Sequence, residues 1–420
     1  MTRAFKHYAL AVALSWLAAW PVSAATCPVK LGALLPLTGP LAPVVAGMLT
    51  SAELAVDEIN EAGGVLGCKL SMVVRDSQAQ PSLAVDGARQ LIDLEGVGVI
   101  VGEVTSGGTL AVLNSVTVPS KVPLISPTAS SPSFSEIGGR TGLFFRTNAS
   151  DALQGVAAAT HAIGRSGTVA VLAVNNDWGQ NLSKVFKAAY EKLGGTVSKV
   201  VLYNPDQTSY RAEVGAAMEG NPDTLYLIGY VTEGARITRD WISQGGPSQF
   251  LFAHNLNDAA FVKAVGASYL GNAMWLTPGT VESPSLGNFR AAYTARTGQS
   301  SEGPGRTSTY DAVVLAALAM QAAHSVHDGP AIAAGFRRAT DPAGTRIVAG
   351  VAGLRSALAL LAEGKPVNYA GATGPLQFDA NGDIAVPFVA WSLDAAGNLQ
   401  VISRMPVEEV EDVRGRIFGK

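Results

Sequence analysis

The chain has 420 residues, of which 48% are hydrophobic and 15% are charged, and its formal net charge is −3. This composition excludes a disordered protein, and the length favours two domains because one core seldom grows beyond about 250–300 residues. The sequence has no basic stripe that could hold a polyanion, so nucleic acid is not expected as a partner.

Residues 1–25 have the pattern of an export signal peptide. Two basic residues precede an apolar run at 9–20 that is too short to span a bilayer, and small residues at 22–25 offer a cleavage site. We therefore expect a periplasmic protein with a cleaved signal, whose charge becomes −5 (30 less two basic residues, against 33 acidic ones). Cys27 raises lipid anchoring as an alternative, but the preceding Thr26 fits that signal poorly, so no anchor is expected.

The chain contains two cysteines, Cys27 and Cys68. Each stands just before a predicted strand, at 29–35 and at 69–75. If these strands are parallel neighbours, the cysteines begin them side by side, and an oxidising compartment then favours a disulfide. The alternative is a pair of buried free thiols, which an exported chain makes less favourable.

Short apolar runs alternate with helical patterns from residue 29 to residue 276. Strands are predicted at 29–35, 69–75, 99–101, 122–125, 143–146, 169–174, 196–203, 224–228, 249–253 and 273–276. Strands that alternate with helices favour parallel βαβ units, and the same order in both halves predicts two similar lobes.

The pattern changes after residue 279. Helices are predicted at 285–297, 308–325, 331–339 and 351–363, followed by a closing strand at 387–393. The acidic run at 408–412 is expected to be a solvated end of the chain.

Two loops rich in hydroxyl groups follow neighbouring strands of the first half. The first loop, at 105–108, opens a predicted helix, and the second spans 126–131. In an open parallel sheet, loops at the carboxyl ends of the strands line the ligand crevice. Hydroxyls and free backbone N–H groups favour an anion, so these loops predict a site for the carboxylate of a small ligand.

The chain resembles the periplasmic substrate-binding proteins of the branched-chain amino acid type, which serve ABC importers. The resemblance rests on segments that occur in the family's order over most of residues 29–393: LGALLPLTGPLA, AELAVDEINEAGGVLGCKL, VGVIVGEVTSG, VPLISPTASSP, STYDAVVLAALAM and GATGPLQFDANGD. It implies a type I periplasmic binding fold with two Rossmann-like α/β lobes, joined by a hinge of three crossings and closing on a ligand between them.

The resemblance also implies limits for the lobes. The crossings would fall near 146–148, 277–279 and 371–375. The N-terminal lobe would comprise residues 27–146 plus 278–371, and the C-terminal lobe residues 147–277 plus 372–420.

Three ligand-binding positions in the first lobe follow from the resemblance. Ser106 matches a serine that contacts the ligand carboxylate, although a plain helix N-cap is the alternative. Thr128 matches a position that offers backbone groups to the ligand. Ser130 matches a hydroxyl that holds the amino or carboxylate group, against the alternative of a turn that satisfies its own backbone.

The opposite wall of the site would come from the second lobe. Trp178 and Tyr230 match ligand-side aromatic positions, and the alternative for Trp178 is a ring packed on a helix start. Glu233 would lie beside them or act only as an acidic residue in the first turn of a helix. His254 and Asn255 stand where amino-acid-binding members carry a glutamate for the ligand ammonium.

This last departure matters for the choice of ligand. A buried ammonium without a carboxylate partner is costly. Glu233 or Asp177 could substitute, or the ligand could be an aliphatic or aromatic acid without an α-amino group.

Two other classes of function were weighed against an importer's binding protein. An enzyme is not expected, because the sequence has no dinucleotide fingerprint, phosphate loop, nucleophile elbow or metal-spaced histidines. We also expect no cofactor and no metal. A ligand sensor of the same fold stays open. For the importer, the expected partners are a small-molecule ligand and a membrane permease, and the protein itself is expected to be a monomer.

Overall fold

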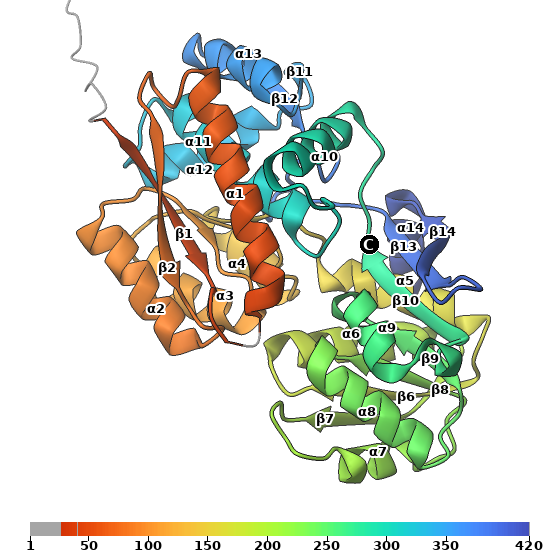
Figure 1. Ribbon diagram of the computed structural model, residues 1–420. Helices are drawn as coiled ribbons and strands as arrows, with labels where there is room; N and C mark the ends of the chain where they lie inside the picture. Colours follow the sequence, from red (N-terminus) through yellow and green to blue (C-terminus); the bar gives the residue numbers. More distant parts are fainter. Residues whose placement is uncertain (1–26, 40, 420) are drawn as a thin grey trace, which may run out of the picture.

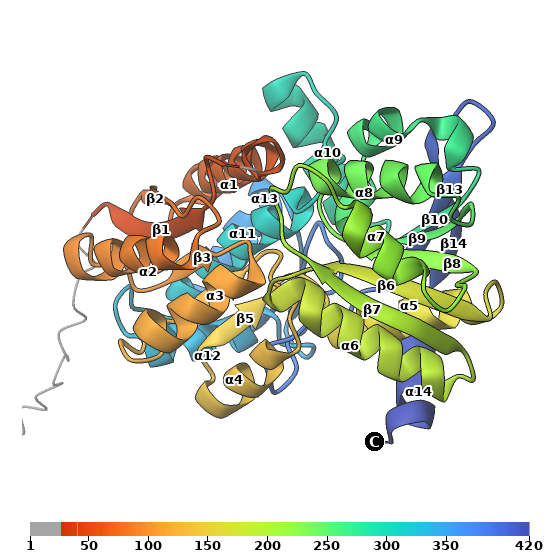
Figure 2. The ribbon, with the colours of Figure 1, turned by 90° about the horizontal axis from the view of Figure 1, so that it is seen from below.

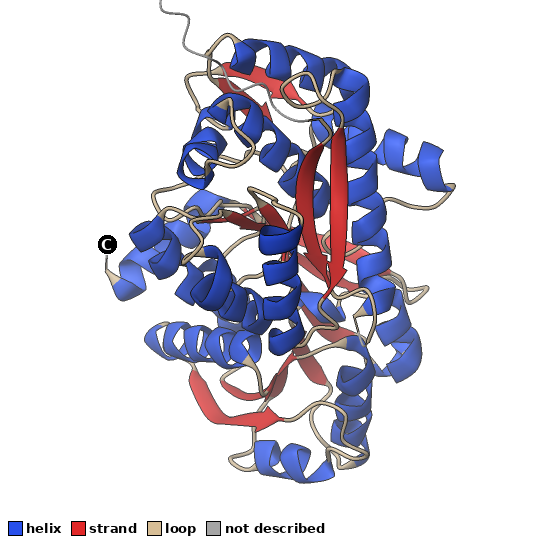
Figure 3. Ribbon diagram, turned by 90° about the vertical axis from the view of Figure 1, so that its left-hand side faces the viewer, coloured by secondary structure: helices blue, strands red, loops and turns tan. Residues whose placement is uncertain are grey.

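The computed structural model describes residues 27–39 and 41–419, so the predicted signal peptide lies outside the described residues. Two β-sheets with helices on their faces form two lobes (Figure 1). We call the part around the five-stranded sheet the first lobe and the part around the seven-stranded sheet the second lobe. Figure 3 shows the helices outside and the strands between them.

The sheet of the first lobe is parallel throughout, in the order β2-β1-β3-β4-β5. Its strands are β1 Val29–Leu35, β2 Leu70–Asp76, β3 Ile100–Gly102, β4 Leu124–Ser126 and β5 Phe144–Arg146. Helices cover both faces, which explains why β1 reads as a nearly continuous apolar run rather than an alternating one. The helices between these strands are α1 Ala42–Ala62, α2 Pro81–Arg89, α3 Ser106–Val112 and α4 Ser133–Thr141, with π-helical turns Gln90–Leu94 and Leu113–Thr117 extending α2 and α3.

The second sheet has the order β14-β13-β10-β9-β8-β6-β7. Its strands are β6 Thr168–Val174, β7 Thr196–Tyr203, β8 Thr224–Ile228, β9 Gln249–Phe252, β10 Asn272–Pro278, β13 Phe388–Leu393 and β14 Leu399–Met405. The parallel part, β7-β6-β8-β9-β10, repeats the strand order of the first sheet, which confirms the two similar α/β lobes. The helices are α5 Asp151–Ile163, α6 Asp177–Lys192, α7 Arg211–Met218, α8 Val231–Ser243 and α9 Ala259–Val265, with 3-10 turns His254–Leu256 and Ala267–Tyr269.

The segment between β10 and β13 returns to the first lobe. It forms α10 Pro284–Thr297, α11 Arg306–Ala323, α12 Gly329–Ala339, β11 Thr345–Val348, α13 Val351–Ala362 and β12 Val367–Ala370. Helix α11 packs against α1, α12 and α13 and is buried almost throughout, as expected for a helix that is apolar on all sides. The chain thus passes between the lobes after β5, after β10 and after β12.

The acidic side chains of the run at 408–412 are exposed, as expected, but the run belongs to a helix that was not predicted. The acidic run at 408–412 lies in helix α14, Val407–Phe418, which packs against α5. Glu408 and Glu409 occupy its first turn, where acidic side chains stabilise a helix, and the buried Val410 and Val413 face the lobe. Strand β14 was also not predicted from the sequence.

The two cysteines form a disulfide. Strands β1 and β2 pair with Val29 opposite Leu70, so Cys27 and Cys68 stand side by side at their starts, with their Cα atoms 5.3 Å apart. This pairing confirms the expected bond. Within residues 27–39 and 41–419, no helix is both long and apolar enough to cross a membrane.

Candidate functional site

The two hydroxyl loops of the first lobe are joined through one buried residue, Glu103. Glu103 follows β3, and its Oε1 accepts a hydrogen bond from the Ser77 hydroxyl at 2.7 Å. Its Oε2 accepts from the Thr105 backbone N–H at 2.7 Å, and its carbonyl oxygen accepts from Ser126 Oγ at 2.7 Å. Burial raises the pKa of Glu103. The sequence reasoning did not single out this residue, although it precedes the first loop.

Ser106 lies at the first position of α3, and Thr105 is the N-cap. The Thr105 hydroxyl oxygen accepts a hydrogen bond from the Gly108 N–H at 3.2 Å, so the interpretation of Ser106 as the N-cap is wrong. The Ser106 side chain is 4% exposed, and its Oγ accepts from the Ser131 N–H at 3.3 Å. In the described part of the chain this hydroxyl has no other recorded hydrogen bond, which leaves its proton for a ligand oxygen.

Thr128 and Ser130, in the loop after β4, contact different parts of the molecule. The Thr128 hydroxyl donates to the Val104 carbonyl at 2.8 Å, and the Thr128 carbonyl accepts from Asn148 Nδ2 at 3.2 Å. The Ser130 hydroxyl donates to Asp151 Oδ2 at 2.9 Å. Because Asp151 begins α5, this bond joins the hydroxyl loop of the first lobe to the second lobe.

Three predicted residues of the second lobe form one aromatic cluster. The ring centroid of Trp178 lies 5.4 Å from that of Tyr230 and 5.3 Å from that of His254. They follow β6, β8 and β9, which are neighbours in the sheet, so the carboxyl ends of these parallel strands bring them together. Burial raises the pKa of Tyr230 to about 12, with Glu233 and Glu103 adding to the shift, so Tyr230 also lies near the first lobe.

His254 is neutral in this environment. Burial lowers its pKa to about 4, and its Nδ1 lies 3.0 Å from Gln154 Oε1. With that oxygen as acceptor, Nδ1 carries the proton. An imidazole in this state supplies no negative charge for an ammonium, as the sequence reasoning expected.

Glu233 lies in the first turn of α8 and is half-buried. Burial raises its pKa, the nearby Asp206 carboxylate raises it further, and Arg236 lowers it. No hydrogen bond between its side chain and the aromatic cluster is found among the described residues, so a ligand role for Glu233 stays a prediction.

The hydroxyl loops face α6 across the junction of the lobes. Asn181 Nδ2 donates to Ser131 Oγ at 3.2 Å. Figure 2 shows α3 and α6 on the two sides of this junction, and residues of the two helices are in contact.

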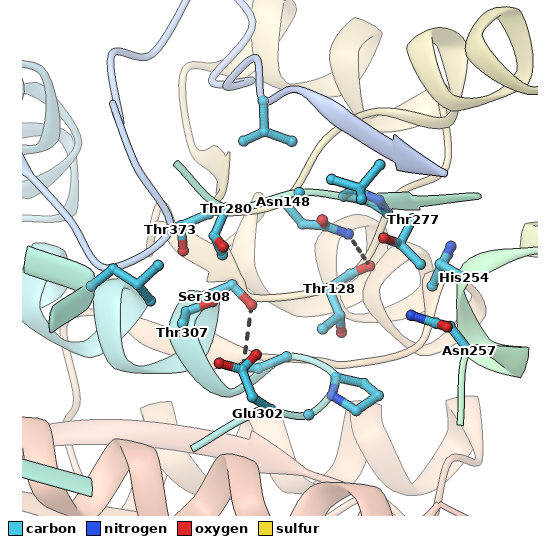
Figure 4. A pocket seen from close by; sticks show the side chains of 18 of the residues that line it. Thr128, Asn148, His254, Asn257, Thr277, Thr280, Glu302, Thr307, Ser308 and Thr373 are labelled. Carbon is cyan, nitrogen blue, oxygen red and sulfur yellow. Dashed lines mark hydrogen bonds between the residues drawn. The ribbon is translucent and has the colours of Figure 1, made fainter. Parts of the chain in front are cut away.

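A cavity of about 510 Å³ lies beside this junction (Figure 4). Three predicted residues line it: Thr128, His254 and Asn255. Ser106, Ser130, Trp178, Tyr230 and Glu233 do not. Most of the polar lining consists of hydroxyl and amide side chains: Thr128, Thr147, Asn148, Asn255, Asn257, Thr277, Thr280, Ser301, Thr307, Ser308 and Thr373.

Most of these lining residues were missed by the sequence reasoning. Apart from Asn257, which follows β9, they come from the segments that pass between the lobes, at 147–148, 277–280 and 373, and from residues 301–308 around the start of α11. The predicted crossings could have identified these residues, because a ligand between two lobes lies close to the segments that join the lobes.

A family model described as periplasmic binding protein matches residues 28–383. The chain belongs to the periplasmic binding protein family. The Leu/Ile/Val-binding protein homolog 3 of Brucella melitensis is 26% identical over 367 residues, which are 87% of this chain and 91% of that protein. The chemotactic signal transduction system substrate-binding protein BasB of Halobacterium salinarum is 27% identical over 379 residues, 88% of each chain.

Solved structures show the same fold. A leucine-binding protein from Thermotoga maritima aligns with a TM-score of 0.76 at 23% identity and covers 91% of this chain and 99% of its own. A solute-binding protein from R. palustris in complex with benzoate aligns with a TM-score of 0.70 at 19% identity and covers 90% of this chain and 96% of its own. Both support a type I periplasmic binding fold.

Among the described residues of this periplasmic binding protein, four of the buried polar atoms without a hydrogen-bond partner lie on α5 and at the start of α6, near the aromatic cluster. They are Asp151 Oδ1, Gln154 Nε2, Asp177 Oδ2 and Trp178 Nε1. Two are acceptors on carboxylates and two are N–H donors, and none of the four residues lines the cavity of about 510 Å³. Among the described residues, no group of three His, Cys, Asp or Glu side chains is placed to hold a metal ion.

Proposed function

We propose that this protein is the extracytoplasmic substrate-binding component of an ABC importer and captures a small carboxylate-bearing ligand between its lobes. The observation that carries the proposal is the cavity of about 510 Å³, which is lined by Thr128 from the first lobe and by His254 and Asn255 from the second. Its volume falls in the range of about 300–1,000 Å³ typical of small-molecule sites.

The ligand carboxylate binds at the hydroxyl loops. Ser106 is buried and its hydroxyl proton is unused, and Ser130 and Thr128 lie in the adjoining loop. A charged acceptor strengthens such hydrogen bonds. His254 and Asn255 line the opposite wall of the cavity, and Trp178 and Tyr230, which lie outside that lining, are proposed to reach the ligand when the lobes close. This side of the site decides what the remainder of the ligand is.

In this proposal the two lobes close on the ligand. The segments near 146–148, 277–279 and 371–375 act as the hinge between residues 27–146 plus 278–371 and residues 147–277 plus 372–420. Such domain closure is a common response to ligand in two-lobed binding proteins. The closed monomer then presents both lobes to a membrane permease. The predicted signal peptide supports a periplasmic location.

Related proteins bind two kinds of ligand according to their names. Branched-chain amino acids are named for the Brucella relative and for a structure with isoleucine, whereas benzoate and 4-hydroxybenzoate occupy two R. palustris proteins. Both kinds carry a carboxylate, in agreement with the hydroxyl loops.

The proposal is tested by thermal unfolding of the mature chain with a panel of amino acids, aliphatic acids and aromatic acids. A ligand at one hundred times its dissociation constant should stabilise the fold by about 2.7 kcal/mol. Small-angle scattering should show a smaller radius of gyration with that ligand. A panel without any stabilising acid, or chemical turnover of a bound one, would contradict the proposal.

A second candidate is a ligand sensor. The observation that favours it is the similarity to BasB, which is named as part of a chemotactic signal transduction system. Co-purification with a permease from membranes would support the importer, and co-purification with a receptor would support the sensor.

A further inference from the structure

Two of the segments that pass between the lobes are bonded to the start of α11. In the segment after β5, the Thr147 hydroxyl donates a hydrogen bond to the Ser308 carbonyl at 2.8 Å. In the segment after β12, the backbone N–H groups of Ala372 and Thr373 donate to the Asp311 carboxylate at 2.9 and 2.7 Å. Helix α11 is buried in the first lobe against α1, α12 and α13, so both segments are attached to a rigid element.

Asp311 fixes the segment after β12 in a tight turn. Its Oδ1 accepts from the Ala372 N–H and, at 2.8 Å, from the Tyr369 hydroxyl, whereas its Oδ2 accepts from the Thr373 N–H. Residue 371 is a glycine, and a Cβ there would lie 2.5 Å from Asp311 Oδ1. Glycine at this position therefore lets the carboxylate approach the backbone of the turn.

Thr373 connects this turn to the cavity and to the segment after β10. Its carbonyl accepts from the Val281 N–H at 3.4 Å. Thr373 also lines the cavity, together with Thr147 and Ser308, the other pair at the start of α11 (Figure 4). A change in the bonds of Asp311 therefore reaches all three segments between the lobes and the lining of the cavity.

The Asp311 carboxylate is buried without a cation. It is 0% exposed, and among the described residues no lysine or arginine forms a hydrogen bond or ion pair with it. The titratable groups that face it are Tyr369 on β12, Tyr310 on α11 and, through a hydrogen bond from Tyr310, Glu58 on α1. The arginines of the surrounding elements bond to other groups: Arg290 to Glu282, Arg296 to Asp57, Arg306 to the Ser300 carbonyl, Arg337 to the Asp379 carbonyl, Arg338 to the Ala322 carbonyl and Arg355 to the Glu61 carbonyl.

This environment allows Asp311 to titrate near neutral pH. Burial raises its pKa to about 6, against the lowering effect of its hydrogen bonds. The protonated fraction then increases from about 3% at pH 7.5 to about 90% at pH 5. Protonation converts one acceptor oxygen into a hydroxyl donor. Because Oδ2 accepts only the bond from Thr373, its protonation places a second donor against that N–H and breaks the bond.

We propose that Asp311 is a proton-controlled positioning residue of the hinge, which fixes the segments between the lobes as a carboxylate and releases them when it is protonated. The lobes of the protonated form then sample a wider range of arrangements, so a smaller fraction of molecules is competent to bind. This inference rests on the proposed closing of the lobes and adds a control of that motion by pH.

The experiment uses the mature chain without ligand, so it does not depend on which ligand binds. Spin labels at Ser82→Cys on α2 and Ala212→Cys on α7, both exposed, report the distance between the lobes, because the two native cysteines are joined in a disulfide. We expect a narrow distance distribution at pH 7.5 and a broader one at pH 5. Over the same range, hydrogen exchange of the Ala372 and Thr373 amides, corrected for its intrinsic rate, should become at least about tenfold faster.

The variants Asp311→Asn and Asp394→Asn form a matched pair. Asp394 also accepts backbone bonds in a turn, from the Ala396 and Asn398 N–H groups, but it lies between β13 and β14. The bond from Asn398 lowers the pKa of Asp394, so this group stays ionised over the range. Asp311→Asn should show the broad distribution and the fast exchange at both pH values, and Asp394→Asn should behave as the wild type.

Tyr369→Phe tests the inference without removing the carboxylate and serves if Asp311→Asn does not fold. Loss of the phenol donor should raise the pKa of Asp311 further, so the transition should move to higher pH. A transition at equal or lower pH in this variant would overturn the inference.

A second buried carboxylate provides the competing explanation. Burial raises the pKa of Asp151 to about 7, and this residue accepts a hydrogen bond from Ser130 of the first lobe. A lobe distance in the wild type that does not change with pH, or a transition that Asp151→Asn abolishes and Asp311→Asn keeps, would overturn the role of Asp311 while the binding function stands. Failure of every acid to bind would contradict the binding function but leave this measurement valid.

Discussion

Arg146 Nε lies 2.7 Å from Asp383 Oδ1, an ion pair between residues 237 positions apart that fixes the hydroxyl loop of the first lobe. The Arg146 side chain is fully buried, and its Nη1 donates to the carbonyls of Ala129 and Ser131, the two residues that flank Ser130. One guanidinium therefore links the segment after β12 to the loop that should bind the ligand.

Replacement of Asp383 by alanine should leave Arg146 as a buried charge without its partner. We expect the free energy of unfolding to fall by roughly 3–5 kcal/mol, and ligand affinity to fall with it as the loop loosens. Guanidinium-induced unfolding measures the first effect. Lys187→Ala is the control, because its pair with Glu191 is exposed and should contribute less than about 1 kcal/mol. Similar losses in both variants would contradict this role of Arg146.

Removal of the Cys27–Cys68 disulfide should destabilise the protein without changing the site. The bond closes a loop of 41 positions, which corresponds to about 4 kcal/mol in the chain-entropy model. The double variant Cys27→Ser/Cys68→Ser should show this loss in denaturant, and a reducing agent should lower the wild type to the same stability. A reducing agent that affects both proteins equally would show that the bond does not stabilise the fold.

His254 should make stability depend on pH. Its folded-state pKa of about 4 lies below the unfolded value of about 6.5, so the unfolded chain binds the proton more tightly. The contribution of neutral His254 to the free energy of unfolding is therefore fully present above about pH 6.5 and is lost as the pH drops towards 4. Between pH 7.5 and pH 5, the wild type should lose about 1–2 kcal/mol more than His254→Gln. Identical pH profiles would indicate that folding does not lower the pKa of His254, which a histidine titration by NMR checks directly.

Trp178 should contribute a hydrogen bond to the ligand through its unpartnered Nε1. Trp178→Phe keeps a ring next to Tyr230 and His254 but removes this donor, so affinity should fall about tenfold or more if the bond is to a charged group, with little change in stability.

Trp241→Phe is the matched control for this change. Trp241 is buried in α8, and its Nε1 already donates to the Pro247 carbonyl at 2.9 Å. The Trp241→Phe variant should lose about 1 kcal/mol in its free energy of unfolding and should keep its ligand affinity. If affinity falls only in the Trp241 variant, Trp178 is not part of the site.

Local sequence patterns predicted much of the fold and part of the candidate site. Alternating apolar runs and helical repeats predicted the parallel strands of both lobes, because burial on both faces leaves a clear signal in each short segment. These patterns also predicted that Trp178, Tyr230 and His254 lie close together, because residues that follow neighbouring parallel strands meet at one edge of the sheet. Helix α14 and strand β14 were missed, because their buried residues are few and depend on α5 and β13 as partners.

The sequence by itself therefore determined the two α/β lobes, the disulfide partners and the edge at which a ligand should bind. Only the tertiary structure decided which charges face that edge. Asp151 accepts a hydrogen bond from Ser130, 21 positions away, and Arg146 pairs with Asp383, 237 positions away. Burial and pairing of charges depend on the segments that surround them in space, and no local pattern in the chain records those neighbours.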